Sequence, residues 1–458
     1  DTSIAFSKCF CQQTDLPAHY QSHYELVTTI LRDEIGLQLE ESELLDTILG
    51  ADEMGLQLEE ASNATTINST TTCKSSTHMA LVWLTLDILN NNVLLEDTAR
   101  IHRRFVLAIC FWSWYNDDDS TLSSWIHTDG WMKTDHECNW YGIECDNDTG
   151  EVVSIHLPHN HLVGSIPMQL ASLHQELQRV NLFSNAITGT IPTELRLLTR
   201  LVQFDMGVNR FSGSIPTELG QWTHLTELGL ESNDFSESIP SEIGALTNLE
   251  RLSLGNNYLL QGSIPHQLTH CTALVSLNLN FNDLRGTVPQ DIVRLSNLEF
   301  LGLKSNKLAG SLPWSIGTLQ NITQLELDDN ILTGKIPMAL GMCSSLKYLK
   351  LQGNRFTGSI PTEMGQLEQL LDFSVAYNRL SGSIPSELGN CRTLTFFDTN
   401  ENVRLKGAVP SELGSLQNLQ RFRFQKTEVS GEICDLFQNK SVSLFGECKE
   451  CSDCCADC

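Results

Sequence analysis

The stretch Leu346-Lys347-Tyr348-Leu349-Lys350-Leu351-Gln352-Gly353-Asn354-Arg355-Phe356-Thr357-Gly358-Ser359-Ile360-Pro361 is one copy of a unit that returns every 24 or 25 residues. Within it, Leu349 and Leu351 alternate with polar residues, and this period of two predicts a short strand with one buried face. Asn354 follows the strand, where its side-chain amide can bond backbone groups that a buried turn leaves unpaired. The copy ends in Gly-x-Ile-Pro, so a strand, a turn and a restricted backbone segment recur in order.

The final proline shows how far the repetition extends. Eleven of the chain's 13 prolines stand at this position, namely Pro167, Pro192, Pro216, Pro240, Pro265, Pro289, Pro313, Pro337, Pro361, Pro385 and Pro410. A twelfth unit has Cys434 there, and Glu237 stands where another unit should have glycine. A single unit cannot bury its apolar face, so the units must stack into a continuous coil with a shared core.

The asparagine after the strand recurs as well. It is found at Asn160, Asn185, Asn209, Asn233, Asn257, Asn282, Asn306, Asn330, Asn354, Asn378 and Asn402. We expect these amides to form a ladder, and the shorter Thr427 of the twelfth unit fits a terminal repeat. Extra residues within 257–261 and 400–404 fall at the ladder turn. There we expect small bulges that leave the strand register intact.

The repeated pattern resembles that of leucine-rich repeat proteins, and its Gly-x-Ile-Pro ending resembles the plant-type members over residues 152–433. Upstream, Cys138-Asn139-Trp140-Tyr141-Gly142-Ile143-Glu144-Cys145 is similar to the amino-terminal cap motif of that family. The resemblance implies an α/β solenoid, a right-handed superhelix of about 12 repeats with parallel strands on the concave side. It also implies a second short strand at the Gly-x-Ile-Pro segment and a disulfide between Cys138 and Cys145.

We expect four segments along the chain. Residues 1–75 are an acidic segment in which 33–41 nearly recurs as 52–60, followed by a Ser/Thr-rich linker. This segment is open to two interpretations, an acidic spacer or a docking element. Residues 76–151 form a helical, disulfide-containing cap, 152–433 the repeat array and 434–458 a Cys-rich cap that covers the last repeat.

The formal charge of −27 argues against binding nucleic acid or an anionic membrane, because both need basic surfaces. No apolar run approaches the roughly 18 residues that span a bilayer. The chain begins at Asp1 without a signal sequence, which we interpret as a processed mature form or an excised ectodomain. Five Asn-x-Ser/Thr sequons predict an extracellular or cell-surface glycoprotein, at Asn63, Asn68, Asn147, Asn321 and Asn439.

The 15 cysteines divide by position. Cys271, Cys343 and Cys391 occupy a slot that is leucine in other repeats, so we expect buried, apolar side chains. Cys110 is either a disulfide partner or a free core thiol. For the carboxyl-terminal cysteines we favour a disulfide-closed cap over a zinc or copper cluster, since histidine is absent there. His156, His159 and His161 lack a nearby acidic ligand, so the sequence predicts neither a metal site nor a cofactor.

No catalytic motif accompanies the repeats, which indicates a non-enzymatic protein. We therefore expect the exposed strand positions to bind a protein or peptide partner, as in a recognition or adhesion scaffold. The candidate ligand contacts are Phe281, Phe300, Glu326, Asp328, Tyr348, Tyr377 and Phe396. The competing hypothesis is a structural protein whose copies join head to tail into an extracellular fibre or matrix through the acidic amino-terminal segment and the Cys-rich ends. Its candidate assembly contacts are Arg421, Arg423 and Lys426.

A third alternative is adsorption to a polysaccharide or crystalline surface, which needs ranks of like side chains. The residues at one strand position in successive repeats, which we call the strand column, disfavour it because they do not repeat. They are Ser154, Arg179, Gln203, Glu227, Arg251 and Ser276.

Overall fold

The computed structural model describes residues 76–89, 97–115, 125–133, 135–174, 176–430, 436–437 and 442–445. The chain divides into two compact units, residues 1–201 with 208–211 and residues 202–207 with 212–458. The predictions for segment 1–75, for the linkages of the Cys-rich end and for Asn63, Asn68 and Asn439 lie outside the described residues. Within those residues, no helix has the length and apolar character needed to cross a membrane.

The described part of the first unit contains two helices, α4 (Ser76–Leu89) and α5 (Thr98–Trp114), where the sequence predicted a helical cap. Asp97 caps α5, since its side chain accepts a hydrogen bond from the backbone N–H of Arg100 at 3.0 Å. Three strands follow, β1 (Ile143–Cys145), β2 (Val152–His156) and β3 (Arg179–Asn181). Strand β1 pairs antiparallel with β2, and β2 pairs parallel with β3. The disulfide between Cys138 and Cys145 is present, as the family resemblance implied.

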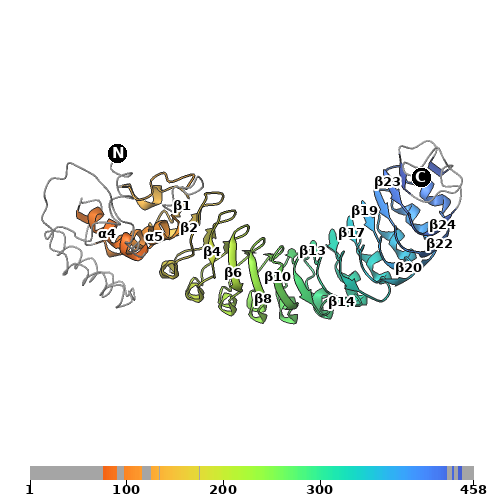
Figure 1. Cartoon of the computed structure of the whole chain (residues 1–458), viewed down its shortest axis with the longest axis horizontal. Helices are drawn as coiled ribbons and strands as arrows, with labels where there is room; N and C mark the ends of the chain where they lie inside the picture. The colour runs from red at the N-terminus through yellow and green to blue at the C-terminus, as the bar shows by residue number, and fades with distance from the viewer. Residues whose placement is uncertain are drawn as a thin grey trace, which may run out of the picture. The chain divides into compact units, whose positions relative to one another are not determined.

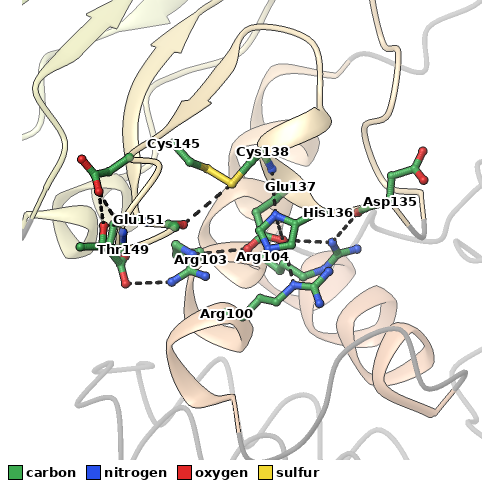
Figure 2. Close-up of a disulfide and its surroundings, with 12 residues drawn as sticks. Arg100, Arg103, Arg104, Asp135, His136, Glu137, Cys138, Cys145, Thr149 and Glu151 are labelled. Atoms are coloured by element: carbon green, nitrogen blue, oxygen red, sulfur yellow. Dashed lines mark hydrogen bonds and ion pairs between the residues drawn. A yellow bond between two sulfur atoms is a disulfide. The ribbon is translucent and has the colours of Figure 1, made fainter.

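A buried ionic cluster joins α5 to this disulfide loop (Figure 2). The Glu137 carboxylate is 0% exposed and lies 3.1 Å from Arg100 and 3.3 Å from both Arg103 and Arg104. The Arg104 guanidinium also lies between the rings of Trp83 and Trp140, 5.1 and 5.0 Å from their centroids. This cluster was not predicted, because its members are separated along the chain.

The second unit contains a long parallel sheet whose strands follow one another in chain order. They are β5 (Gln203–Asp205), β7 (Glu227–Gly229), β9 (Arg251–Ser253), β11 (Ser276–Asn278), β13 (Phe300–Gly302), β15 (Gln324–Glu326), β17 (Tyr348–Lys350), β19 (Asp372–Ser374), β21 (Phe396–Asp398), β23 (Arg421–Arg423) and β25 (Ser443–Phe445). Each strand buries its middle residue, as the period of two predicted. In Figure 1, β13, β17, β19 and β23 line the inner side of this unit's curve.

A second set of short strands precedes the Ile-Pro dipeptides. These are β4 (Thr188–Gly189), β6 (Arg210–Ser214), β8 (Asp234–Ser238), β10 (Leu259–Ser263), β12 (Asp283–Arg285), β14 (Ala309–Gly310), β16 (Ile331–Leu332), β18 (Thr357–Gly358), β20 (Arg379–Gly382), β22 (Arg404–Ala408) and β24 (Glu428–Ser430). They confirm the second strand that the resemblance implied. Each of these strands ends no later than the residue after the repeat glycine, or after Glu237 where that residue replaces the glycine.

Short 3-10 helices follow the repeat prolines, and one more lies in the disulfide loop. Their bounds are η2 (Glu137–Asn139), η3 (Met168–Leu173), η4 (Thr193–Leu197), η5 (Thr217–Gln221), η6 (Ser241–Ala245), η7 (His266–His270), η8 (Gln290–Arg294), η9 (Trp314–Thr318), η10 (Met338–Met342), η11 (Thr362–Gln366), η12 (Ser386–Asn390) and η13 (Ser411–Ser415).

The asparagine ladder is confirmed within each unit. In the second unit, the Nδ2 of Asn354 donates to the carbonyls of Leu327 at 2.8 Å and Leu351 at 3.2 Å. Its Oδ1 accepts the backbone N–H of Leu332 at 3.0 Å, so one side chain ties two successive repeats together. The Thr427 hydroxyl bonds within its own repeat, donating to the carbonyl of Phe424 at 2.6 Å and accepting the backbone N–H of Val429 at 3.3 Å. The Thr427 side chain is too short to reach the neighbouring repeat, as expected.

The two inserted residues are accommodated as predicted. Strands β9 and β11, on either side of the insertion at 257–261, pair in unbroken register, and so do β21 and β23 on either side of the insertion at 400–404. The insertion exposes Tyr258 to 68% and Leu259 to 59%, while Leu260 remains in the core. The three cysteines in the leucine slot, Cys271, Cys343 and Cys391, are buried free thiols, and so is Cys110. Burial raises the pKa of Cys271 to about 12, which keeps that thiol protonated and inert.

Candidate ligand-binding surface

The residues on either side of each buried strand residue form one face of the long sheet of the second unit, which we call the strand face. Most of them are half-buried or exposed, and Gly229, Gly302, Ser374 and Asp398 are buried. The two residues before each ladder asparagine extend the strand face. The second of these has a left-handed backbone, as at Phe281 (φ 58°) and Tyr377 (φ 52°). This conformation is uncommon for residues other than glycine and was not predicted.

The centre of the strand face carries three of the predicted contacts side by side. Phe300 of β13 and Tyr348 of β17 both pair in register with Gln324 of β15, so the three form one row across adjacent strands. Glu326 lies two residues beyond Gln324 on β15, and the Gln324 Nε2 donates to its Oε1 at 2.6 Å. Phe300 is half-buried and Tyr348 is 38% exposed, so both rings are accessible.

Asp328 does not belong to the accessible surface, which corrects the sequence-based prediction. Its side chain is 1% exposed, and Lys304 lies 2.9 Å from its Oδ2. Burial raises the pKa of the Asp328 carboxyl, although the Lys304 ammonium opposes this effect. The same ammonium lies 5.6 Å from the centroid of the Phe281 ring. Asp328, Lys304 and Phe281 therefore form an internal cluster of acid, cation and aromatic ring.

The aromatic ring of Phe396 is engaged in a second cluster of this kind. Lys350 and Arg423 lie 5.3 and 5.5 Å from its centroid. Lys350 pairs with Asp372, and Arg423 lies 3.6 Å from Asp398. Burial raises the pKa of both aspartates, and their cationic partners act in the opposite direction.

The predicted assembly contacts are largely occupied by internal partners. Arg423 belongs to the Phe396 cluster, and Lys426 lies 2.5 Å from Glu401. Arg421 and Arg423 both lie over the ring of Phe445, at 5.8 and 5.5 Å. The basic patch that was expected to receive an acidic arm is therefore largely paired within its own chain. Arg421 is exposed, and the contact of its guanidinium is with the Phe445 ring rather than with an acidic side chain.

An acidic cluster at the other end of the strand face was not predicted. It comprises Asp205, Glu227 and Glu231, placed around Gly229, whose added Cβ would lie 2.7 Å from the Asp205 Oδ1. Burial raises the pKa of Asp205 to about 6. The negative charges of Glu231 and Glu227 act in the same direction, and the hydrogen bond from the Gly207 N–H opposes them. Arg251 lies 3.2 Å from Glu227 and so balances one of these carboxylates.

Two of the five sequons fall within the described residues. Asn147 is exposed in the turn between β1 and β2. Asn321 is also exposed, and its Nδ2 donates to the carbonyl of Ser296 at 3.0 Å. Both remain predicted glycosylation sites. In the part of the chain that the structure describes, no group of three or more His, Cys, Asp or Glu side chains is arranged to hold a metal ion.

Comparison with known proteins agrees with this architecture. The Leucine Rich Repeat family model matches residues 224–246, 248–271 and 345–367. The receptor-like protein kinase HSL1 of Arabidopsis thaliana is 34% identical over 80 residues, which are 18% of this chain and 7% of that protein. The chain thus spans only a small part of that relative's length.

Solved structures match a larger share. PEPR1–AtPEP1 is 34% identical and has a TM-score of 0.59, over 67% of this chain and 46% of that one. The Arabidopsis receptor kinase HAESA ectodomain, in complex with an IDA peptide hormone ligand, is 29% identical with a TM-score of 0.60, over 68% and 52%. A plant ice-binding protein is 25% identical with a TM-score of 0.52, over 71% and 93%. On its repeats and its fold, the chain is a leucine-rich repeat solenoid, and it is similar to plant receptor ectodomains.

Proposed function

We propose that this protein is an extracellular, non-enzymatic scaffold that binds a peptide on the strand face around β13, β15 and β17. The observation that carries the proposal is the row of Phe300, Gln324 and Tyr348 beside Glu326. Accessible aromatic rings next to an oriented carboxylate are typical of binding hot spots. The strand face is rigid, because the ladder holds every repeat, so a ligand would bind with little ordering of the protein.

The comparisons support this proposal. The HAESA ectodomain is a peptide hormone receptor of the same fold. In the chain described here, the sequons support an extracellular location and the net charge of −27 disfavours nucleic acid as a partner. The self-assembly hypothesis gains no comparable support, since its basic contacts are mostly paired internally.

A displayed library of random 12-residue peptides, panned against the whole chain, would test this function. We expect peptides to be enriched whose binding is weakened at least about tenfold by Phe300→Ala or Tyr348→Ala, the range of a moderate hot spot. Trp314→Ala is the matched control, because Trp314 is an 80% exposed aromatic residue on η9, outside the long sheet. Enriched peptides that bind both strand-face variants like the unchanged protein would contradict the proposal.

A second candidate function is adsorption to a regular surface such as ice, because one column of side chains is more regular than the strand column. The residue two positions before the repeat proline is an exposed serine or threonine at Ser214, Ser238, Ser263, Thr287, Ser311, Ser359 and Ser383 in the second unit. Lys335 interrupts the series, and Ala408 ends it. The chain also covers 93% of a plant ice-binding protein.

Inhibition of ice recrystallisation by the purified protein would test this second candidate. The double variant Ser238→Tyr, Ser263→Tyr should lose any such inhibition, since bulky rings would interrupt the hydroxyl column. Absence of inhibition by the unchanged protein would remove this candidate.

A further inference from the structure

We infer that Glu326, Phe300 and Tyr348 form a subsite for a cationic side chain, the guanidinium of arginine or the ammonium of lysine, in the bound peptide. This inference rests on the proposed function and adds the chemistry of the ligand. It follows from the orientation of Glu326, from the charge around it and from two clusters elsewhere on the same surface.

The orientation of the Glu326 carboxylate is fixed by two amides. Gln324 donates to its Oε1 at 2.6 Å, and Asn280 donates from Nδ2 to its Oε2 at 2.7 Å. The Asn280 amide is itself oriented, because its Oδ1 accepts the backbone N–H of Lys304 at 2.7 Å. Its NH₂ group must then point toward Glu326.

A glycine allows the Asn280 side chain to reach Glu326. Asn280 belongs to the repeat of β11 and Glu326 to that of β15, so the amide spans the intervening β13. Gly302 occupies β13 at that point, and an added Cβ there would lie 2.8 Å from the Asn280 Nδ2 and 2.7 Å from the Phe300 Cζ. A larger residue would displace both the amide and the ring.

The two amides orient the carboxylate without neutralising it. An ionised carboxylate has about four acceptor positions, and the amides use two of them. Two lysines flank Glu326. Lys304 interacts with it electrostatically but pairs with Asp328 at 2.9 Å, and Lys350, in register with Glu326 on β17, pairs with Asp372. Among the described residues, none of the ion pairs includes Glu326. A half-buried, oriented negative charge beside two aromatic rings favours a cation from the ligand.

The protein builds the same combination twice with its own cations. Asp328, Lys304 and Phe281 form one set, and Asp372, Lys350 and Phe396 form the other. In both, a lysine pairs with a carboxylate and lies within 6 Å of an aromatic ring, the range of a cation–π interaction. At Glu326 the carboxylate and the rings belong to the protein, and the inferred cation belongs to the peptide.

The test uses arginine-containing peptides from the 12-residue library and their citrulline analogues, which keep the shape of arginine but lack its charge. We expect enriched peptides to share a lysine or arginine, and citrulline to weaken binding at least about tenfold, as loss of a charge-assisted contact should. Glu326→Gln should weaken the arginine peptide by a similar factor and leave the citrulline peptide within about twofold. Asn280→Ala should give a smaller loss, because it only frees the carboxylate to move.

Glu368→Gln is the matched control, since it removes one exposed negative charge outside this cluster. Circular dichroism of each variant would establish that it folds. If Phe300→Ala abolishes binding while arginine and citrulline peptides bind equally well, the inference fails and the proposed function stands. If binding ignores Phe300 and Tyr348 altogether, or no peptide is enriched, both fail.

Discussion

At the scale of single residues, the ladder asparagines contribute most to the regularity of the fold. Asn354 satisfies the backbone N–H of Leu332 and the carbonyls of Leu327 and Leu351, all within the buried turn. Asn354→Ala would leave the Leu332 N–H without its acceptor, whereas Asn330 and Asn378 would still donate to the Leu327 and Leu351 carbonyls. Because an unpaired buried N–H costs about 1–3 kcal/mol and each of the two lost amide bonds about 0.5–1.5 kcal/mol, we expect the free energy of unfolding to fall by about 2–4 kcal/mol. Urea unfolding followed by circular dichroism would measure it.

Thr427→Ala provides the comparison for this ladder variant. The Thr427 hydroxyl donates to the carbonyl of Phe424 at 2.6 Å and accepts the Val429 N–H at 3.3 Å, both half-buried bonds within one repeat, so its removal should cost about 1 kcal/mol. Equal losses for the two variants would show that the ladder does not carry the stability assigned to it.

Asp205 is the residue whose protonation should matter most near neutral pH. Burial raises its pKa to about 6, above the value of about 3.9 for an unfolded aspartate. The folded protein therefore binds this proton more tightly than the unfolded chain, and stability falls as pH rises from about 4 through 6. We expect Asp205→Asn, which retains an acceptor for the Gly207 N–H, to melt at a higher temperature than the unchanged protein at pH 7.

The difference in melting temperature should disappear near pH 4, where the unchanged Asp205 is protonated. Thermal unfolding of both proteins from pH 4 to pH 8 would check this. A difference that is constant across the pH range would assign the effect to packing rather than to charge.

At the scale of elements, charges hold helix α5 to the disulfide loop. Burial alone would raise the pKa of Glu137, but its own backbone N–H, His136 and Arg100 together lower it, so the group is a carboxylate. Glu137→Gln removes the carboxylate that Arg100, Arg103 and Arg104 share, while Asp87 remains 2.8 Å from Arg104 and Glu151 2.8 Å from Arg103. Because these two arginines keep a counter-charge, we expect this region to lose about 3 kcal/mol of stability, the lower end of the range for removing one partner of a buried ion pair.

Tryptophan fluorescence would report this loss, because Trp83 and Trp140 contact Arg104 directly. The control is Glu144→Gln, whose partner Arg179 lies 3.1 Å away with both side chains well exposed. An exposed pair contributes about 0–1 kcal/mol, so this control should unfold nearly as the unchanged protein does. Similar losses in the two variants would contradict a structural role for the Glu137 cluster.

The sequence could predict those features that recur from repeat to repeat. Repetition revealed the strands, the ladder, the buried cysteines and the tolerated insertions, because each depends on a position that recurs. Features made by residues from different repeats or from distant segments escaped prediction. Asp328 looked like a surface acid until its pairing with Lys304 was visible, and the link from Asn280 across Gly302 to Glu326 depends on three separate repeats. The disulfide came from family resemblance, and the ionic cluster around Glu137 from neither source.

At the scale of the whole molecule, the charge of −27 arises from 56 acidic and 29 basic residues. The stacking of the repeats places some of the excess acidic side chains in columns. Glu363, Glu387 and Glu412 follow the prolines of successive repeats, and an added Cβ at Gly365 would lie 2.7 Å from the Glu387 Cβ, so the turns pack closely. Successive carboxylates repel one another, and this repulsion is relieved when the chain unfolds.

Salt should therefore stabilise the folded protein. Raising the ionic strength from about 0.01 M to about 0.15 M shortens the Debye length from about 30 Å to about 8 Å and screens these exposed charges. We expect the melting temperature to rise with sodium chloride, and Glu387→Gln, which removes the middle charge of the column, to reduce the increment. The Glu137 cluster is buried and should respond little, so the salt effect should be the same in Glu137→Gln as in the unchanged protein. A melting temperature that falls with salt would mean that attractive surface pairs, such as Arg251 with Glu227, outweigh the repulsion.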